Sequence, residues 1–160
     1  MDIVSSKQDE AIYNMTKVYL AQIDSAMKIS KILCDHSEEK ELTGDHIICG
    51  LIYRLMVPMT DGEMIDSLDK ADHLMNDTDS DEEEHESDEE GYESDEEENF
   101  NIEISDKKRP LKMNNCNCDI CVKCRECVSG YESYETYDPM VTRFKESIKI
   151  TCDKYGIYIN

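Results

Sequence analysis

Five cysteines lie within twelve residues in the second half of the chain, and this cluster is the part of the sequence best able to support chemistry. They are Cys116, Cys118, Cys121, Cys124 and Cys127. Zinc takes four soft ligands in a tetrahedron, and each C-x-x-C turn supplies two of them. Cys118 with Cys121 and Cys124 with Cys127 form two such turns. The spacing therefore predicts a zinc site held in a tight loop.

The same spacing leaves alternatives open. The two pairs are adjacent, whereas zinc ribbons and fingers separate theirs by about a dozen residues or more. Cys152 or a histidine elsewhere is therefore an alternative source of the fourth ligand. Thiols that stay reduced or form disulfides are a second interpretation, and an iron–sulfur cluster is a third. We expect His36 and His46 to be surface or capping residues and Cys34 to pack as a small hydrophobe.

A repeated acidic motif suggests chemistry of another kind. Ser-Asp-Glu-Glu occurs three times with a period of seven, beginning at Ser80, Ser87 and Ser94. An acidophilic kinase of the casein kinase type accepts serines in this context. Phosphorylation would add about −1.5 to −2 charges at each site. The alternative is that these serines only keep the segment soluble.

The repeat belongs to a strongly acidic run. Residues 77–98 contain fifteen Asp and Glu and no Lys or Arg, so they carry −15 of the chain's formal −21. Such a composition cannot support a core, which predicts a disordered linker over residues 77–115. A short basic patch, Lys107, Lys108 and Arg109, lies near its end. A polyanion favours basic protein partners and disfavours nucleic acid and anionic membranes.

Signals for catalysis, secretion and membrane insertion are missing from the sequence. It contains no Gly-rich phosphate loop, no H-E-x-x-H and no nucleophile elbow, which predicts a protein that is not an enzyme. The N-terminus lacks a basic and apolar leader, and the longest apolar stretch is short and interrupted by Arg54. We therefore expect a nuclear or cytoplasmic protein that is neither secreted nor membrane-bound.

The elements that position these residues are predicted to be mainly α-helical. In a helical segment, residues 1–76, Ser5 and Gln8 predict a capping box for a helix over residues 6–35. Helices over 44–57 and 61–75 follow, capped by Thr43 and Thr60. The first helix carries an apolar stripe at steps of three and four, which consists of Ile12, Met15, Tyr19, Ile23, Ala26, Ile29 and Leu33. Three helices give only a small core, so the stripe predicts a homodimer or heterodimer.

The predicted Cys-rich module, residues 116–160, ends in a helix. Asp138 and Pro139 are a typical N-cap and first helical residue. Gly156 is suited to the C-terminal cap, and residues 157–159 are expected to form a short strand.

One segment, LCDHSEEKELTGDHIICGL at residues 33–51, resembles histone-fold proteins of the transcription-factor type. In that family a long central helix ends in a polar break. A Lys, an aliphatic residue, a Ser or Thr, an acid and an aliphatic residue then lead into a short helix. Here these positions are Lys40, Leu42, Thr43, Asp45 and Ile47.

The resemblance covers residues 6–57 and implies an obligate dimer with crossed central helices. It also implies that Lys40 and Thr43 contact a DNA backbone. The family's short first helix and its Arg-rich first loop have no counterpart here, so dimerisation is the stronger implication and direct DNA binding the weaker.

These patterns together predict a non-enzymatic interaction or assembly protein, and the resemblance implies a histone-fold-like role in chromatin or transcription. Its partners would be basic proteins or a histone-fold mate. One alternative is a thiol-redox or metal-handling protein that acts through the Cys cluster. Another is a structural virion component of a large DNA virus.

Overall fold

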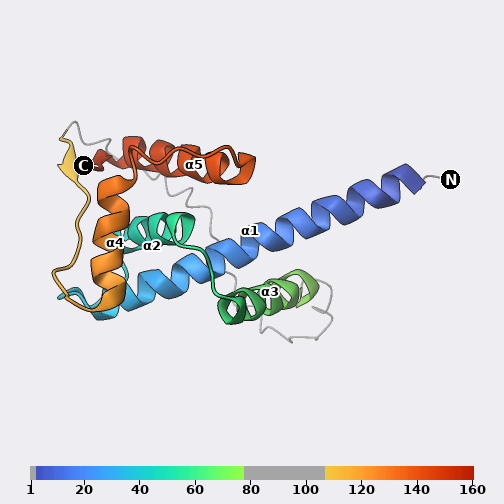
Figure 1. Ribbon diagram of the computed structural model, residues 1–160, viewed down its shortest axis with the longest axis horizontal. Helices are drawn as coiled ribbons and strands as arrows, with labels where there is room; N and C mark the ends of the chain where they lie inside the picture. The colour runs from blue at the N-terminus through green and yellow to red at the C-terminus, as the bar shows by residue number, and fades with distance from the viewer. Residues whose placement is uncertain (1–2, 78–106) are drawn as a thin grey trace, which may run out of the picture.

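The computed structural model describes residues 3–77 and 107–160, and within these ranges the chain is mainly α-helical, as predicted. Its elements are α1 (Ile3–Asp35), α2 (Gly44–Met56), α3 (Asp61–Asn76), β1 (Arg109–Pro110), α4 (Asp119–Gly130), α5 (Pro139–Tyr155) and β2 (Ile157–Tyr158) (Figure 1). The predicted phosphorylation sites Ser80, Ser87 and Ser94, with the acidic run from residue 78 onward, lie outside the described residues.

The long helix α1 begins earlier than the sequence predicts. It starts at Ile3, so Ser5 lies inside the helix and the predicted capping box of Ser5 with Gln8 is wrong. No Gly or Pro interrupts its 33 residues, and these are the two residue types that most disfavour a helix interior. At about 1.5 Å per residue, the helix is roughly 50 Å long.

Thr43 and Thr60 cap the starts of α2 and α3, as predicted, and each forms a capping box. The Thr43 side chain accepts from the His46 backbone N–H, and the His46 ring accepts from the Thr43 N–H. Thr60 and Glu63 form the equivalent pair on α3. Each box satisfies backbone donors that the first helical turn leaves unpaired. His46 is therefore a capping residue, as expected.

The helix α2 lies at the centre of the molecule, where it packs against α1, α4 and α5 (Figure 1). The helices α1 and α2 approach closely at Gly50, because its missing side chain leaves room for Ser30. A Cβ at Gly50 would lie 2.0 Å from Ser30 Oγ and 2.6 Å from the Ala26 carbonyl oxygen. The Ser30 hydroxyl is buried in this contact and donates to that same carbonyl oxygen at 2.9 Å.

The C-terminal elements begin and end at the predicted signals. Asp138 caps α5, Pro139 is its first residue, and Gly156 ends it in the left-handed conformation at φ 65° and ψ 30°. The strand β2 then pairs in parallel with β1 through Arg109 and Pro110. Residues 107–115, predicted as the end of the linker, contribute this strand and the buried Leu111.

One hydrophobic core joins the predicted helical segment to the predicted Cys-rich module. Ile29, Leu33 and Ile52 from the first half pack with Cys121, Val128 and Ile148 from the second. In α2, Ile48, Cys49, Ile52 and Leu55 are all buried, because the helix meets neighbours on several sides. Within residues 3–77 and 107–160, no helix is long and apolar enough to span a bilayer.

Candidate metal centre and apolar groove

Four potential metal ligands come together where α1 ends and α4 begins. His36 directly follows the last residue of α1, and Cys116 and Cys118 lie in the loop before α4. Cys121 is in the first turn of α4. One ligand atom from each lies within 4.8 Å of all the others. The sequence separation between His36 and Cys116 is 80 residues, so the group connects the two halves of the chain.

The distances in this group suit a tetrahedral ion. His36 Nδ1 lies 3.1 Å from Cys118 Sγ, 3.4 Å from Cys116 Sγ and 3.7 Å from Cys121 Sγ. In tetrahedral zinc, Zn–S bonds of about 2.3 Å and Zn–N bonds of about 2.0–2.1 Å place N and S about 3.6 Å apart. Three thiolates and one imidazole form a known structural zinc ligand set. The arrangement can therefore hold a metal ion, and its donor chemistry favours zinc.

Hydrogen bonds around the group orient the sulfur atoms. The Asn114 amide donates to Cys121 Sγ at 3.3 Å and to the Leu33 carbonyl oxygen at 3.0 Å. Arg125 in turn donates to the carbonyl oxygens of Asn114 and Cys116 at 2.9 and 2.8 Å. Contacts of this kind hold metal ligands in position before the metal arrives.

The thiol groups differ in acidity. A hydrogen bond from the Cys121 backbone N–H is the main reason that the pKa of Cys118 falls to about 6. Cys118 is also the N-cap of α4, where a helix favours negative charge. Burial instead raises the pKa of Cys121 to about 12. A cation would be required to ionise Cys121 at neutral pH, as thiolate ligation of a metal does.

The other candidate ligands lie elsewhere. Cys124 and Cys127 are on α4 and are buried in the core, and Cys152 is buried there on α5. Because a helix rises about 1.5 Å per residue, residues 124 and 127 lie progressively farther from its N-terminal end. The helix therefore separates the two C-x-x-C pairs, which the sequence suggested would share a tight loop. Burial is the main cause that raises the pKa of Cys127 and of Cys152, so both favour the neutral thiol.

His36 is the candidate ligand that the sequence prediction did not select, although it left a histidine elsewhere open as the source of the fourth ligand. It was expected to be a surface or capping residue, yet its ring nitrogen faces three cysteines that lie 80 to 85 residues away. The only local signal is its place in the polar break after α1, because spacing rules for metal ligands apply within one segment.

The predicted nucleic-acid contacts and basic patch have mostly local roles in the fold. Lys40 is exposed, and the Thr43 hydroxyl caps α2. Arg109 forms a bidentate pair with the buried carboxylate of Asp45, with both N···O distances at 2.8 Å. Burial by itself raises the pKa of Asp45, but hydrogen bonds from Arg109 and from the Lys112 N–H outweigh it and lower the pKa below its ordinary value.

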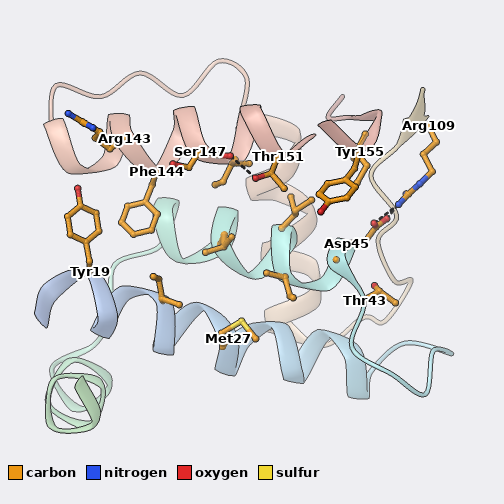
Figure 2. A pocket seen from close by; sticks show the side chains of 17 residues that line it. Tyr19, Met27, Thr43, Asp45, Arg109, Arg143, Phe144, Ser147, Thr151 and Tyr155 are labelled. Carbon is orange, nitrogen blue, oxygen red and sulfur yellow. Dashed lines mark hydrogen bonds and ion pairs between the residues drawn. The ribbon is translucent and has the colours of Figure 1, made fainter. Parts of the chain in front are cut away.

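A second feature is a large groove between α5 and the pair α1 and α2 (Figure 2). Its volume is about 960 Å³ and its floor and walls are mostly apolar. The apolar lining includes Tyr19, Ile23, Met27, Ile47, Ile48, Leu51, Phe144, Ile148, Tyr155 and Ile157. The sequence prediction missed this groove, because it forms only when α5 packs across the first two helices.

The two ends of the groove differ. At one end the rings of Tyr19 and Phe144 meet with centroids 5.2 Å apart, and Arg143 lies beside them (Figure 2). At the other end Tyr155 lies near the ion pair of Asp45 with Arg109. Arg143 is exposed and forms no ion pair within the described ranges.

No protein-family model, curated protein or solved structure matches this chain. The resemblance to histone-fold proteins therefore stays a prediction.

Proposed function

We propose that the protein is a non-enzymatic interaction protein whose fold is held together by one structural zinc ion. The observation that carries this proposal is the group of His36, Cys116, Cys118 and Cys121 between the end of α1 and the start of α4. Four protein ligands complete the coordination of zinc and leave no open position for a substrate. That favours a structural ion over a catalytic one.

The position of the group explains what the ion would do. It closes a loop of 80 residues between His36 and Cys116, and closing such a loop in the unfolded chain costs conformational entropy that grows slowly with loop length. The acidic run falls between these two ligands. Zinc would therefore keep the two folded halves together while a segment of charge −15 lies between them.

The interaction role is supported by the apolar groove. An apolar cavity of about 960 Å³ lies within the size range of ligand sites, and exposed apolar surface of this kind marks binding regions. We place partner binding there. The acidic run adds attraction for basic partners, and a histone-fold mate remains one candidate among them.

Metal analysis tests the zinc proposal directly. Protein purified without added metal should contain one zinc per chain by elemental analysis, and Cys116→Ser should contain markedly less. The matched control is Cys127→Ser, which removes a buried thiol outside the group and should retain zinc. Equal zinc content in both variants, or protein without zinc, would contradict the proposal.

A thiol-based role is the second candidate, and the grouping of Cys116, Cys118 and Cys121 in one place favours it. The hydrogen bond from the Cys121 backbone N–H lowers the pKa of Cys118, and a thiol with a lowered pKa reacts more readily when it is accessible. Cys118 is only half-buried. Thiol titration of the purified protein separates the two roles. Rapid, reversible formation of a Cys116–Cys118 disulfide by exchange with an added disulfide reagent, which is reduced in turn, supports redox chemistry. Protection of the thiols that ends when a chelator is added supports bound zinc.

A further inference from the structure

The apolar stripe of α1 is covered along only part of its length. Towards the C-terminal end, Ala26, Ile29 and Leu33 are buried in the core. Towards the N-terminal end, Ile12 and Met15 belong to the same stripe but are 63% and 56% exposed. The stripe thus continues from an established helix interface onto a bare surface.

No other described element covers the apolar stripe on this N-terminal half. Residues 4–16 are all exposed, and the beginning of α1 projects past every other helix (Figure 1). We call residues 3–18 the α1 arm. The helix α3 contacts α1 on a different face, where Asp72 accepts from Tyr13 at 3.2 Å and pairs with Lys17 at 2.7 Å. That contact holds α1 in place and leaves the apolar stripe of the arm open.

The groove between α1 and α5 begins where the arm ends. Tyr19 and Ile23 belong to the stripe and also line the groove. Ile12, Met15, Tyr19 and Ile23 follow one another at helical steps of three and four, so they share one face of the helix. An apolar ridge and an apolar groove are therefore neighbours on a single continuous surface.

We infer that the occupant of the groove is the α1 arm of a second copy of this chain. Two copies related by a two-fold axis near Tyr19 would lie with their α1 helices antiparallel. Each arm would then enter the groove of the other copy, which is the self-complementary contact that two-fold symmetry requires. A helix from an unrelated protein would fill the groove but leave the arm bare. The second copy accounts for both surfaces at once.

This inference rests on the proposed interaction role and names its partner. The test is the mass of the full-length, metal-loaded protein by size-exclusion chromatography with light scattering, at about 0.15 M salt so that acidic repulsion is screened. The mass of the wild type measured by light scattering should be twice the chain mass of 18.5 kDa. Ile12→Glu combined with Met15→Glu should give a monomer with unchanged helix content, because both side chains are already exposed.

The matched control is Ile65→Glu on α3, where the isoleucine is 61% exposed, nearly as much as Ile12. It should remain a dimer. A wild type that stays monomeric, or a dimer that survives the arm substitutions, overturns the inference.

Zinc content measured on the same samples separates this inference from the proposed function. A monomer with one zinc per chain would contradict the dimer and support the structural zinc ion. A dimer without zinc would support the paired arms and contradict the structural zinc ion. If Ile65→Glu gave a monomer while the arm variant stayed a dimer, the interface would lie on α3, and this result would also overturn the inference.

Discussion

Asn114 connects the candidate metal centre to the body of the protein through a single side chain. Its amide donates both to a sulfur ligand, Cys121, and to the carbonyl oxygen of Leu33 in the last turns of α1. It therefore helps to orient two of the segments that the ion would join. Sequence alone gave no reason to select it, because an asparagine in a loop is most often a turn residue.

Replacement of this side chain should weaken metal binding without removing a ligand. We expect Asn114→Ala to lower zinc affinity by about 10- to 100-fold, the range seen when partners of metal ligands are lost. Competition with a coloured chelator measures the change. Asn115→Ala is the matched control, since Asn115 is the exposed neighbouring residue, and its affinity should equal that of the wild type. Equal affinities for both variants would contradict a positioning role for Asn114.

Asp45, like Asn114, connects separate segments of the chain through its side chain. Its carboxylate lies in the first turn of α2 and binds both Arg109 and the backbone N–H of Lys112. It thereby fixes the segment that carries β1. Because its pKa is lower in the folded protein than its ordinary value of 3.8, the ionised form stabilises the fold above that pH.

The resulting prediction depends on pH. At pH 7, Asp45→Asn should lower the free energy of unfolding by about 1–3 kcal/mol, the contribution typical of hydrogen bonds to a charged group. As the pH falls below about 4, wild-type Asp45 takes up a proton and the difference between the two proteins should shrink. Urea unfolding of both proteins at pH 7 and below about pH 4 measures this difference in the free energy of unfolding. Loss of zinc in acid affects both proteins alike, so a constant difference would contradict this account.

Among the elements, the crossing of α1 and α2 is the most tightly constrained contact. Gly50 allows the backbone of α1 to approach so closely that an added Cβ would meet the Ala26 carbonyl oxygen at 2.6 Å. Backbone atoms cannot move aside as a flexible side chain can. The two helices must therefore separate if any larger residue replaces this glycine.

We expect Gly50→Ala to destabilise the protein by about 1–3 kcal/mol through overpacking, even though alanine is the better helix former. Gly62→Ala is the control, because a Cβ there meets nothing within 4 Å. It should be neutral or stabilise by up to about 1 kcal/mol. Thermal unfolding of both variants gives the comparison, and a stabilised Gly50→Ala would show that the helices can shift apart at little cost.

The helix ends were the best predicted features of the elements. Thr43, Thr60, Asp138 and Gly156 all act where the sequence indicated, because a cap depends only on residues within one turn. The start of α1 was missed, since Ser5 satisfies the same pattern from inside the helix. The helix over residues 119–130 was also missed, because closely spaced cysteines favoured a loop around a metal.

For the whole molecule, the proposed ion links two halves that also share one core. Cys121 belongs both to the core and to the candidate ligands, and the core residue Leu33 is three residues before His36 in the chain. Packing of the core and metal binding would therefore favour the same arrangement of the two halves. Neither half buries its apolar surface alone, because Ile52 and Ile148 belong to one cluster.

Removal of the metal should weaken the entire fold. Zinc in about 100-fold excess over its dissociation constant stabilises the folded state by about 2.7 kcal/mol. For a chain of this size, that corresponds to about 5–10 °C in melting temperature. Circular dichroism of the full chain, with and without a chelator, measures the shift. Cys116→Ser is the control, because its melting temperature should not respond to the chelator.

The sequence by itself determined the helical class and the ends of most helices, because periodicity and caps act over a few neighbouring residues. It also identified Cys116, Cys118 and Cys121 as candidate ligands, since their types and spacing are local. Only the tertiary structure selected His36 as the fourth member and separated Cys124 and Cys127 from the group. It also created the groove under α5. Those outcomes depend on contacts between segments some 80 or more residues apart, which no local pattern encodes.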